Sequence, residues 1–316
     1  AKRVIFLFMR GGPTHVDTFD YKPRLTIDDG KPSNGQGGKG NNRSWLKPVA
    51  DFKQYGESGL WMSSIFPHLS KHADDMCLLN GMHTDLPNHP QAVVQMHTGS
   101  FRFIRPSLGA WTLYGLGSEN KDLPGFITLS PPSRFGGSQN YGSAFLPAAY
   151  RGTKIGDENR FTEAKLDNLQ NPRLDSGLQR KQLDLLQGIN RDRLERDQVH
   201  PELEGVIQSY ELAFRMQTAV PQLLDINKES KATLDLYGIG DKLTDNFGKQ
   251  CLLARRCAEA GVRFIELTHE GWDQHGNLSS KLASNVGNID KPMAALLTDL
   301  KTRGLLKDCL LYTSPS

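Results

Sequence analysis

The sequence predicts an α/β protein built on a mostly parallel sheet, and two features of its 316 residues support this fold class. The first is a set of short apolar runs, typical of strands that are buried on both faces, as in parallel sheets. The second is a set of amphipathic helical segments between those runs, suited to covering a sheet. At this length we expect one large domain with a helical insertion.

The expected strands are apolar segments bounded by glycine, proline or polar residues. The first of them runs directly into Gly11-Gly12-Pro13, so the chain must turn sharply where that strand ends. One more strand is expected after the last helix. The predicted strands are Val4–Met9, Met76–Met82, Leu123–Pro132 and Val262–Leu267.

Helices are predicted between these strands. Pro90 lies in what would be a first helical turn, where proline is tolerated, and Gly261 lies where a left-handed C-terminal cap belongs. Residues 28–42 and 133–160 are irregular and rich in glycine, so both are predicted as loops, and the second could overhang a site. The predicted helices are Leu60–Leu69, one beginning at Pro90, those within residues 162–236, Lys242–Ala260 and Asn288–Thr302.

Composition excludes two classes of partner and leaves the compartment open. Lys and Arg number 38 against 35 Asp and Glu, and a net charge of +3 is too small to favour nucleic acid or an anionic membrane. No segment approaches the roughly 20 apolar residues of a membrane-spanning helix, so no membrane span is expected. Four cysteines are too few for a disulfide framework. The chain starts at Ala1, so a leader could precede it.

Titratable side chains follow three of the predicted strands, at the point where each strand ends. In an open parallel sheet, ligands bind beyond the carboxyl ends of the strands, so groups far apart in the sequence can converge there. Neutral imidazole and carboxylate are the ligands of catalytic zinc or manganese, and two such ions would polarise an ester. The three sets are His15/Asp17/Asp20, His83/Asp85/His89 and His269/Glu270/Asp273/His275.

Asp273 and His275 are the strongest candidate metal ligands. Their spacing lets both reach one ion from a single turn, and a tryptophan and a glycine flank them as packing anchor and tight turn. Structural interpretations compete elsewhere, because an isolated histidine such as His15 is more often hydrogen-bonded than metal-bound, and Asp17 could cap the following turn. The sequence contains no established nucleophile or nucleotide-binding motif.

Three segments carry a family resemblance: FLFMRGGPTHVDTFDYKP, then NHPQAVVQMHTGS with RPSLGAWTLYGLGSENKDLPGFITL, then GVRFIELTHEGWDQHGN. In this order they resemble the bacterial sulfatase-like family known as domain of unknown function 1501. The resemblance implies a doubly wound fold of the alkaline phosphatase and sulfatase type, with a two-site metal centre that hydrolyses phosphate or sulfate esters. It also implies a twin-arginine export leader and a periplasmic or extracellular location.

The resemblance also assigns metal ligands. The acid-and-histidine motif of the superfamily falls on Asp273 and His275. The ligand that usually follows the first strand directly is replaced by Arg10, so its role passes to Asp17, with His15 beside it. The implied cofactors are divalent metal ions, either zinc, manganese or calcium.

The catalytic position is less conventional. In sulfatases a Cys or Ser nucleophile stands about nine residues before a Thr-Gly pair, and here that position is His89. Either His89 binds metal, or a neighbour such as Thr84 acts, or the site is not a conventional hydrolase. Arg102 or Arg105 could hold the anionic ester, although either could equally be a solvated surface charge.

The C-terminus departs from the family pattern. After GLLKD the family would continue into a strand, a Gly-Gly-Glu-Phe-Gly-Arg type loop and an Asp-His-His stretch, whereas this chain reads CLLYTSPS. We therefore expect one sulfatase-like domain over residues 1–308, incomplete at its C-terminus and inactive as a fragment. Residues 309–316 are expected to be a non-native tail.

The leading hypothesis is an exported, metal-dependent hydrolase of sulfate or phosphate esters, acting on a small-molecule or polysaccharide ester. The main alternative is a non-catalytic binding or scaffold protein on the same fold, which His89 and Arg10 would fit. A cytoplasmic relative of phosphomutases is a third hypothesis, and it requires a gene without a leader.

Overall fold

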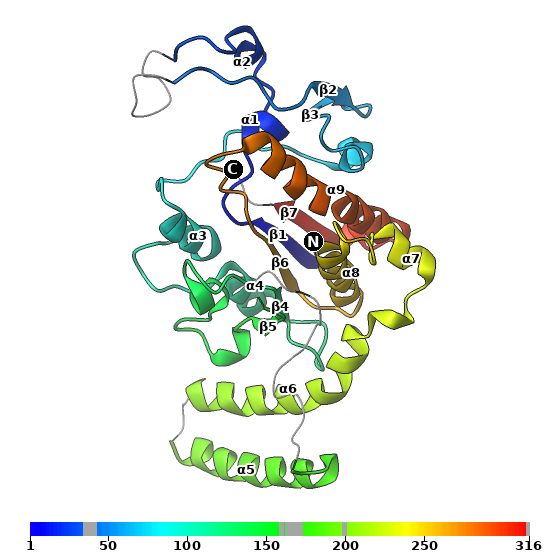
Figure 1. Cartoon of the computed structure of the whole chain (residues 1–316). Helices are drawn as coiled ribbons and strands as arrows, with labels where there is room; N and C mark the ends of the chain where they lie inside the picture. The colour runs from blue at the N-terminus through cyan, green and yellow to red at the C-terminus, as the bar shows by residue number, and fades with distance from the viewer. Residues whose placement is uncertain (34–42, 158–160, 162–172, 198–200, 314–316) are drawn as a thin grey trace.

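The fold is organised around a five-stranded sheet in which each strand runs parallel to its neighbours (Figure 1). The computed structural model describes residues 1–33, 43–157, 161, 173–197 and 201–313. The strands are β1 (Arg3–Met9), β2 (Phe52–Tyr55), β3 (Leu60–Ser63), β4 (Phe126–Leu129), β5 (Thr153–Ile155), β6 (Phe264–His269) and β7 (Cys309–Thr313). The sheet order is β5-β4-β6-β1-β7, and β2 and β3 form a separate antiparallel hairpin.

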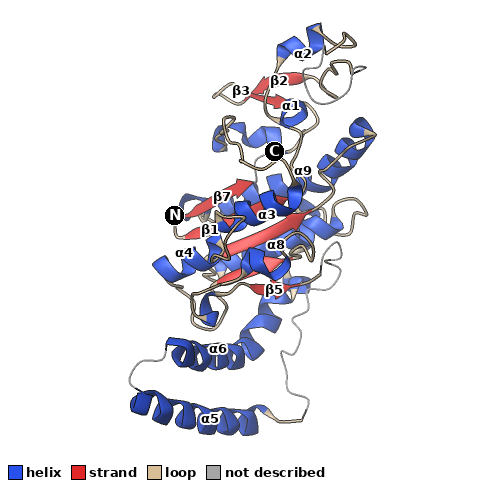
Figure 2. Cartoon of the chain, turned by 90° about the vertical axis from the view of Figure 1, so that its left-hand side faces the viewer, coloured by secondary structure: helices blue, strands red, loops and turns tan. Residues whose placement is uncertain are grey.

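Helices lie on both faces of this sheet (Figure 2). The α-helices are α1 (His15–Thr18), α2 (Pro23–Ile27), α3 (His89–Thr98), α4 (Leu108–Leu116), α5 (Ser176–Asp197), α6 (Pro201–Leu224), α7 (Lys231–Leu236), α8 (Asp245–Glu259) and α9 (Leu278–Thr302). The 3₁₀ helices are η1 (Leu69–Asp75), η2 (Gly137–Tyr141), η3 (Ala148–Tyr150), η4 (Ile226–Lys228) and η5 (Leu306–Asp308). The predicted α/β class with a mostly parallel sheet is therefore confirmed.

β1 and β6 form the centre of the sheet. Val4 lies opposite Phe264 and Met9 opposite His269, so the two strands end level with each other. Because neither strand lies at an edge and both faces are covered, their sequences read as almost continuous apolar runs. The loops after β1 and β6 consequently begin side by side at the carboxyl edge of the sheet.

The two faces of the sheet have different cores. Ile5 and Leu7 of β1 and Ile265 of β6 point to the face covered by α8 and α9, where most of the buried apolar residues lie. Phe6 and Phe264 belong to a smaller, mainly aromatic cluster that includes Val93 of α3 and Leu113 of α4. These two helices cover the opposite face of the sheet (Figures 1 and 2). The alternation follows from the two-residue period of a strand.

Two predicted elements are wrong. Met76–Met82 was expected as a buried strand, but it forms no strand, and Leu79 and Met82 are exposed. A short apolar run does not by itself determine an element, since a strand also needs a hydrogen-bonded partner. Leu60–Leu69 was expected as a helix, but its first part is β3. A turn containing Gly56 and Gly59, both at positive φ, pairs it with β2.

The helical insertion agrees with prediction where it is described. Helices α5, α6 and α7 lie within residues 162–236, and α5 and α6 pack as an antiparallel pair at one end of the molecule (Figure 1). Parts of the predicted segment, residues 162–172 and 198–200, lie outside the described residues, as do residues 34–42 of the first predicted loop. Gly261 has a φ of +86° after α8, as a left-handed cap requires.

Residues 133–160 are less irregular than predicted, because η2, η3 and β5 lie within them. The strand expected after the last helix is β7, which pairs with β1 and begins directly after the predicted boundary at Asp308. The proposed non-native origin of residues 309–316 stays a prediction. No helix in the described part of the chain is both long and apolar enough to cross a membrane.

A buried ion network ties α8 to α9 and to the segment before α7. Arg255, which is 2% exposed, pairs with Glu229 at 2.8 Å, Glu259 at 2.7 Å and Asp299 at 3.0 Å. Tyr237 donates a further hydrogen bond to Asp299. Such a network is costly to break on one side only, because the remaining charges would stay buried.

Candidate metal centre

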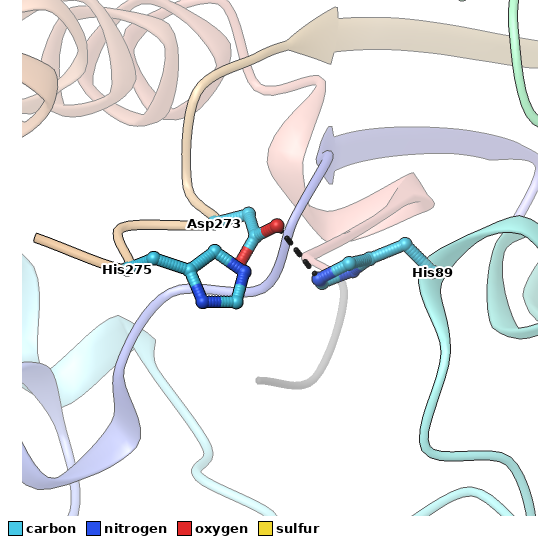
Figure 3. A group of neighbouring side chains, drawn as sticks. All are labelled: His89, Asp273 and His275. Carbon is cyan, nitrogen blue, oxygen red and sulfur yellow. Dashed lines mark ion pairs between the residues drawn. The ribbon is translucent and has the colours of Figure 1, made fainter.

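His89, Asp273 and His275 meet beyond the carboxyl edge of the sheet (Figure 3). His89 Nε2 lies 3.1 Å from Asp273 Oδ2, and His275 Nε2 lies 2.8 Å from Asp273 Oδ1. Asp273 and His275 come from the loop after β6, whereas His89 begins α3. The structure thus brings together the two ligands predicted most strongly and the residue in the predicted catalytic position.

Asp273 is held by close packing of its loop against the end of β1. The Trp272 N–H donates to the Arg10 carbonyl at 3.2 Å, and the Trp272 side chain is 2% exposed. Gly11 has a φ of +109°, and a Cβ there would overlap the backbone of Asp273. Gly11 is therefore needed both for its conformation and for this approach.

His269, the last residue of β6, is a support rather than a ligand. Its Nδ1 accepts a hydrogen bond from Trp272 Nε1 at 2.9 Å. An accepting Nδ1 carries no proton, so the remaining proton is on Nε2. Burial lowers the pKa of His269 to about 4, which keeps the ring neutral at ordinary pH.

His89 owes its position to the start of α3. Asn88 has extended backbone angles at the cap position, and Pro90 falls within the first turn, as predicted. The unpaired N–H groups of a first turn carry partial positive charge. The end of α3 that carries His89 therefore also favours an anion.

The three side chains fit a divalent cation. Their ligand atoms lie within 4.8 Å of one another, and among the described residues they form the one such group of His, Cys, Asp or Glu. Two imidazoles and one carboxylate match the donor sets of catalytic zinc and manganese sites, which leave a coordination position open. The side chain of His89 is 39% exposed and that of Asp273 is 43% exposed, so the group is open to solvent.

Arg10 and Glu270 form a second charged feature beside this group. Arg10 pairs with Glu270 at 2.6 Å, and its guanidinium lies over the Phe135 ring at 5.4 Å. Both side chains are mostly buried. The position where the sequence resemblance implies a metal ligand in related enzymes is thus occupied by an arginine in an ion pair.

Asp17 and His15 make local contacts instead of joining the group. Asp17 is buried and accepts hydrogen bonds from Thr14 Oγ1 at 2.7 Å and from the Val49 N–H at 2.9 Å. His15 Nδ1 lies 3.1 Å from Asp20 Oδ2. Both contacts suit the structural interpretation of these residues, and their ligand roles stay predictions.

The predicted anion-binding arginines follow the far end of α3. His89 is in the first turn of this ten-residue helix, which spans about 15 Å, and Arg102 and Arg105 come after its last residue. Both are exposed and lie against neighbouring aromatic rings. His83 and Asp85, which follow the segment wrongly predicted as a strand, are exposed.

Sequence reasoning missed a buried pair between the helix and the strand that lead to this site. His97 of α3 lies 3.3 Å from Glu266 of β6, and the two side chains are 2% and 1% exposed. A signal was present, because Glu266 interrupts the apolar run of a strand buried on both faces. A buried carboxylate needs a partner.

Comparison with known proteins gave one result. No curated protein and no solved structure matches the chain. The sequence profile described as "Protein of unknown function (DUF1501)" matches residues 1–314, which is nearly the whole chain. The chain therefore belongs to the DUF1501 family.

Proposed function

We propose that this protein is a metal-dependent hydrolase of sulfate or phosphate esters. The observation that carries the proposal is the convergence of His89, Asp273 and His275 from two distant segments. Their place at the carboxyl edge of a parallel sheet is where ligands bind in open α/β folds. The resemblance to sulfatase-like proteins supplies the ester class.

Each residue has a distinct part in this proposal. His89, Asp273 and His275 would hold a divalent ion, which when bound would polarise an ester oxygen as a Lewis acid. His89 Nε2 lies 3.1 Å from Asp273 Oδ2, so this nitrogen can share a metal ion with the carboxylate. The arrangement favours a metal-ligand role for His89 over direct attack on the ester. The first-turn amides of α3 would orient the anionic group of the ester.

A non-catalytic binding or scaffold protein is the second candidate. The closed ion pair of Arg10 and Glu270 favours it, because this pair occupies a position that supplies a metal ligand in active superfamily members. A protein of this kind could keep the fold and the anion site without turnover.

Metal analysis and turnover distinguish the two candidates. The product of the complete gene is purified, its zinc, manganese and calcium are measured, and hydrolysis of an aryl sulfate and an aryl phosphate is followed. The hydrolase proposal predicts bound metal and turnover, both lost in Asp273→Ala and both kept in Asp235→Ala, a matched change at an exposed position. Metal-free, inactive wild-type protein would contradict it.

A further inference from the structure

α3 is tied to the sheet by one buried polar contact. His97 Nε2 lies 3.3 Å from Glu266 Oε1, and His97 Nδ1 lies 2.7 Å from the Val93 carbonyl oxygen. The rings of Phe6 and Phe8 pack around the imidazole, with the Phe8 ring edge-on at 4.5 Å. The contact is thus enclosed by the aromatic cluster on this face of the sheet.

The hydrogen bonds of His97 indicate an ion pair. A carbonyl oxygen can only accept, so Nδ1 must carry a proton to bond Val93. Nε2 lies 3.3 Å from the carboxyl group of Glu266, and a second proton on this nitrogen would make His97 an imidazolium that faces the carboxyl group. Burial lowers the pKa of His97, but the charge and hydrogen bond of Glu266, with the Val93 carbonyl, raise it above its ordinary value overall.

The same helix and strand carry the candidate metal ligands. His89, Val93 and His97 are four residues apart and share one side of α3, and His97 lies about 12 Å along the helix from His89. On the other side of the contact, Glu266 belongs to β6, whose following loop carries Asp273. α3 therefore meets the β6 segment at two points, one buried and one open to solvent.

We infer that the His97–Glu266 pair positions His89 for metal binding by fixing α3 against β6. The inference rests on the proposed metal site and adds two positioning residues to it. A helix of ten residues that buries only four of them has few other contacts to define its position. A directional, buried contact specifies one position, whereas apolar packing alone would tolerate several.

The test separates positioning from stability. In a double variant, His97→Phe with Glu266→Met, both charges are removed and the volume is kept, an exchange that is often neutral for stability. Val94→Ala is the control, because it removes buried volume from α3 on the side facing Gly136 and leaves the pair intact. Zinc affinity is measured by chelator competition, and stability by thermal unfolding of metal-free protein.

The double variant should unfold near the wild-type temperature yet bind zinc about tenfold more weakly, as for other supporting contacts of metal ligands. Val94→Ala should show the reverse, a lower unfolding temperature with unchanged affinity. Unchanged affinity in a folded double variant overturns the inference and leaves the metal site standing. A wild-type protein without zinc affinity overturns the proposed function. In that case the positioning role is tested by hydrogen exchange at Ala92, whose N–H donates to the Asn88 carbonyl at the start of α3. Unchanged exchange at this amide in the double variant overturns the positioning role.

Discussion

Replacing His269 with glutamine should remove part of the acid sensitivity of the protein. Burial lowers the pKa of His269 from 6.5 to about 4. The unfolded chain therefore takes up a proton at this position below about pH 6.5, while the folded protein takes it up only near pH 4. The stabilisation from the neutral ring is present above pH 6.5 and is lost as the pH falls towards 4.

The size of the effect follows from the same pKa difference. A fall from 6.5 to about 4 corresponds to about 3 kcal/mol of unfolding free energy. Glutamine can still accept the hydrogen bond from Trp272 Nε1, so the loop that carries Asp273 keeps its support. Because glutamine does not titrate, the wild type should lose about 3 kcal/mol of unfolding free energy relative to the variant between neutral pH and pH 4.

Urea unfolding of metal-free protein across this pH window measures the effect. The quantity of interest is the difference in unfolding free energy between wild type and His269→Gln at each pH, since other titrating groups contribute equally to both. His83→Gln, at an exposed position, controls for the substitution itself. A difference that stays constant from neutral pH to pH 4 would refute a buried, neutral His269.

Three further changes should lower the free energy of unfolding, measured by urea titration at neutral pH. Gly11→Ala forces a Cβ into the Asp273 loop at positive φ and should cost about 2 kcal/mol or more. Arg255→Met removes the buried guanidinium that faces Glu229 and Asp299, which keep Arg256 and Arg303 as partners, and should cost about 2 kcal/mol or more. Asp290→Ala removes the acceptor of two backbone N–H groups at η1 and should cost about 2 to 4 kcal/mol. Losses below 1 kcal/mol would contradict these assignments.

The centre of the fold could be predicted because its strands have one environment on both faces. Val4–Met9 is apolar throughout and Val262–Leu267 is mostly apolar, interrupted by Arg263 and Glu266, so burial on both faces and parallel pairing could be predicted from these runs. Their ends then had to lie at one edge, which predicted that Asp273 and His275 would face other strand-end groups. In the structure Asp273 and His275 meet His89, which belongs to another of the predicted sets.

The ligand set could not be completed from the sequence, because local partners compete with distant ones. Asp17 has Thr14 three residues away and His15 has Asp20 five residues away, and each takes the nearby hydrogen bond. Strand-end position predicts proximity to a site but not the direction of a side chain. The Met76–Met82 segment failed for a related reason, since an apolar run predicts burial only if a partner is available.

The charge of the site supports the choice of ester. Asp273 is the one carboxylate among the three candidate ligands, so the ligand set carries less negative charge than a divalent cation carries positive charge. Arg10 is balanced by Glu270 and adds no net charge, while the first turn of α3 adds partial positive charge. The surplus is positive, and it favours an anionic sulfate or phosphate ester over a neutral one. An aryl acetate is therefore the informative negative control for the turnover assay. It has the same leaving group but no anionic group, so the positive charge of the site should not favour its binding.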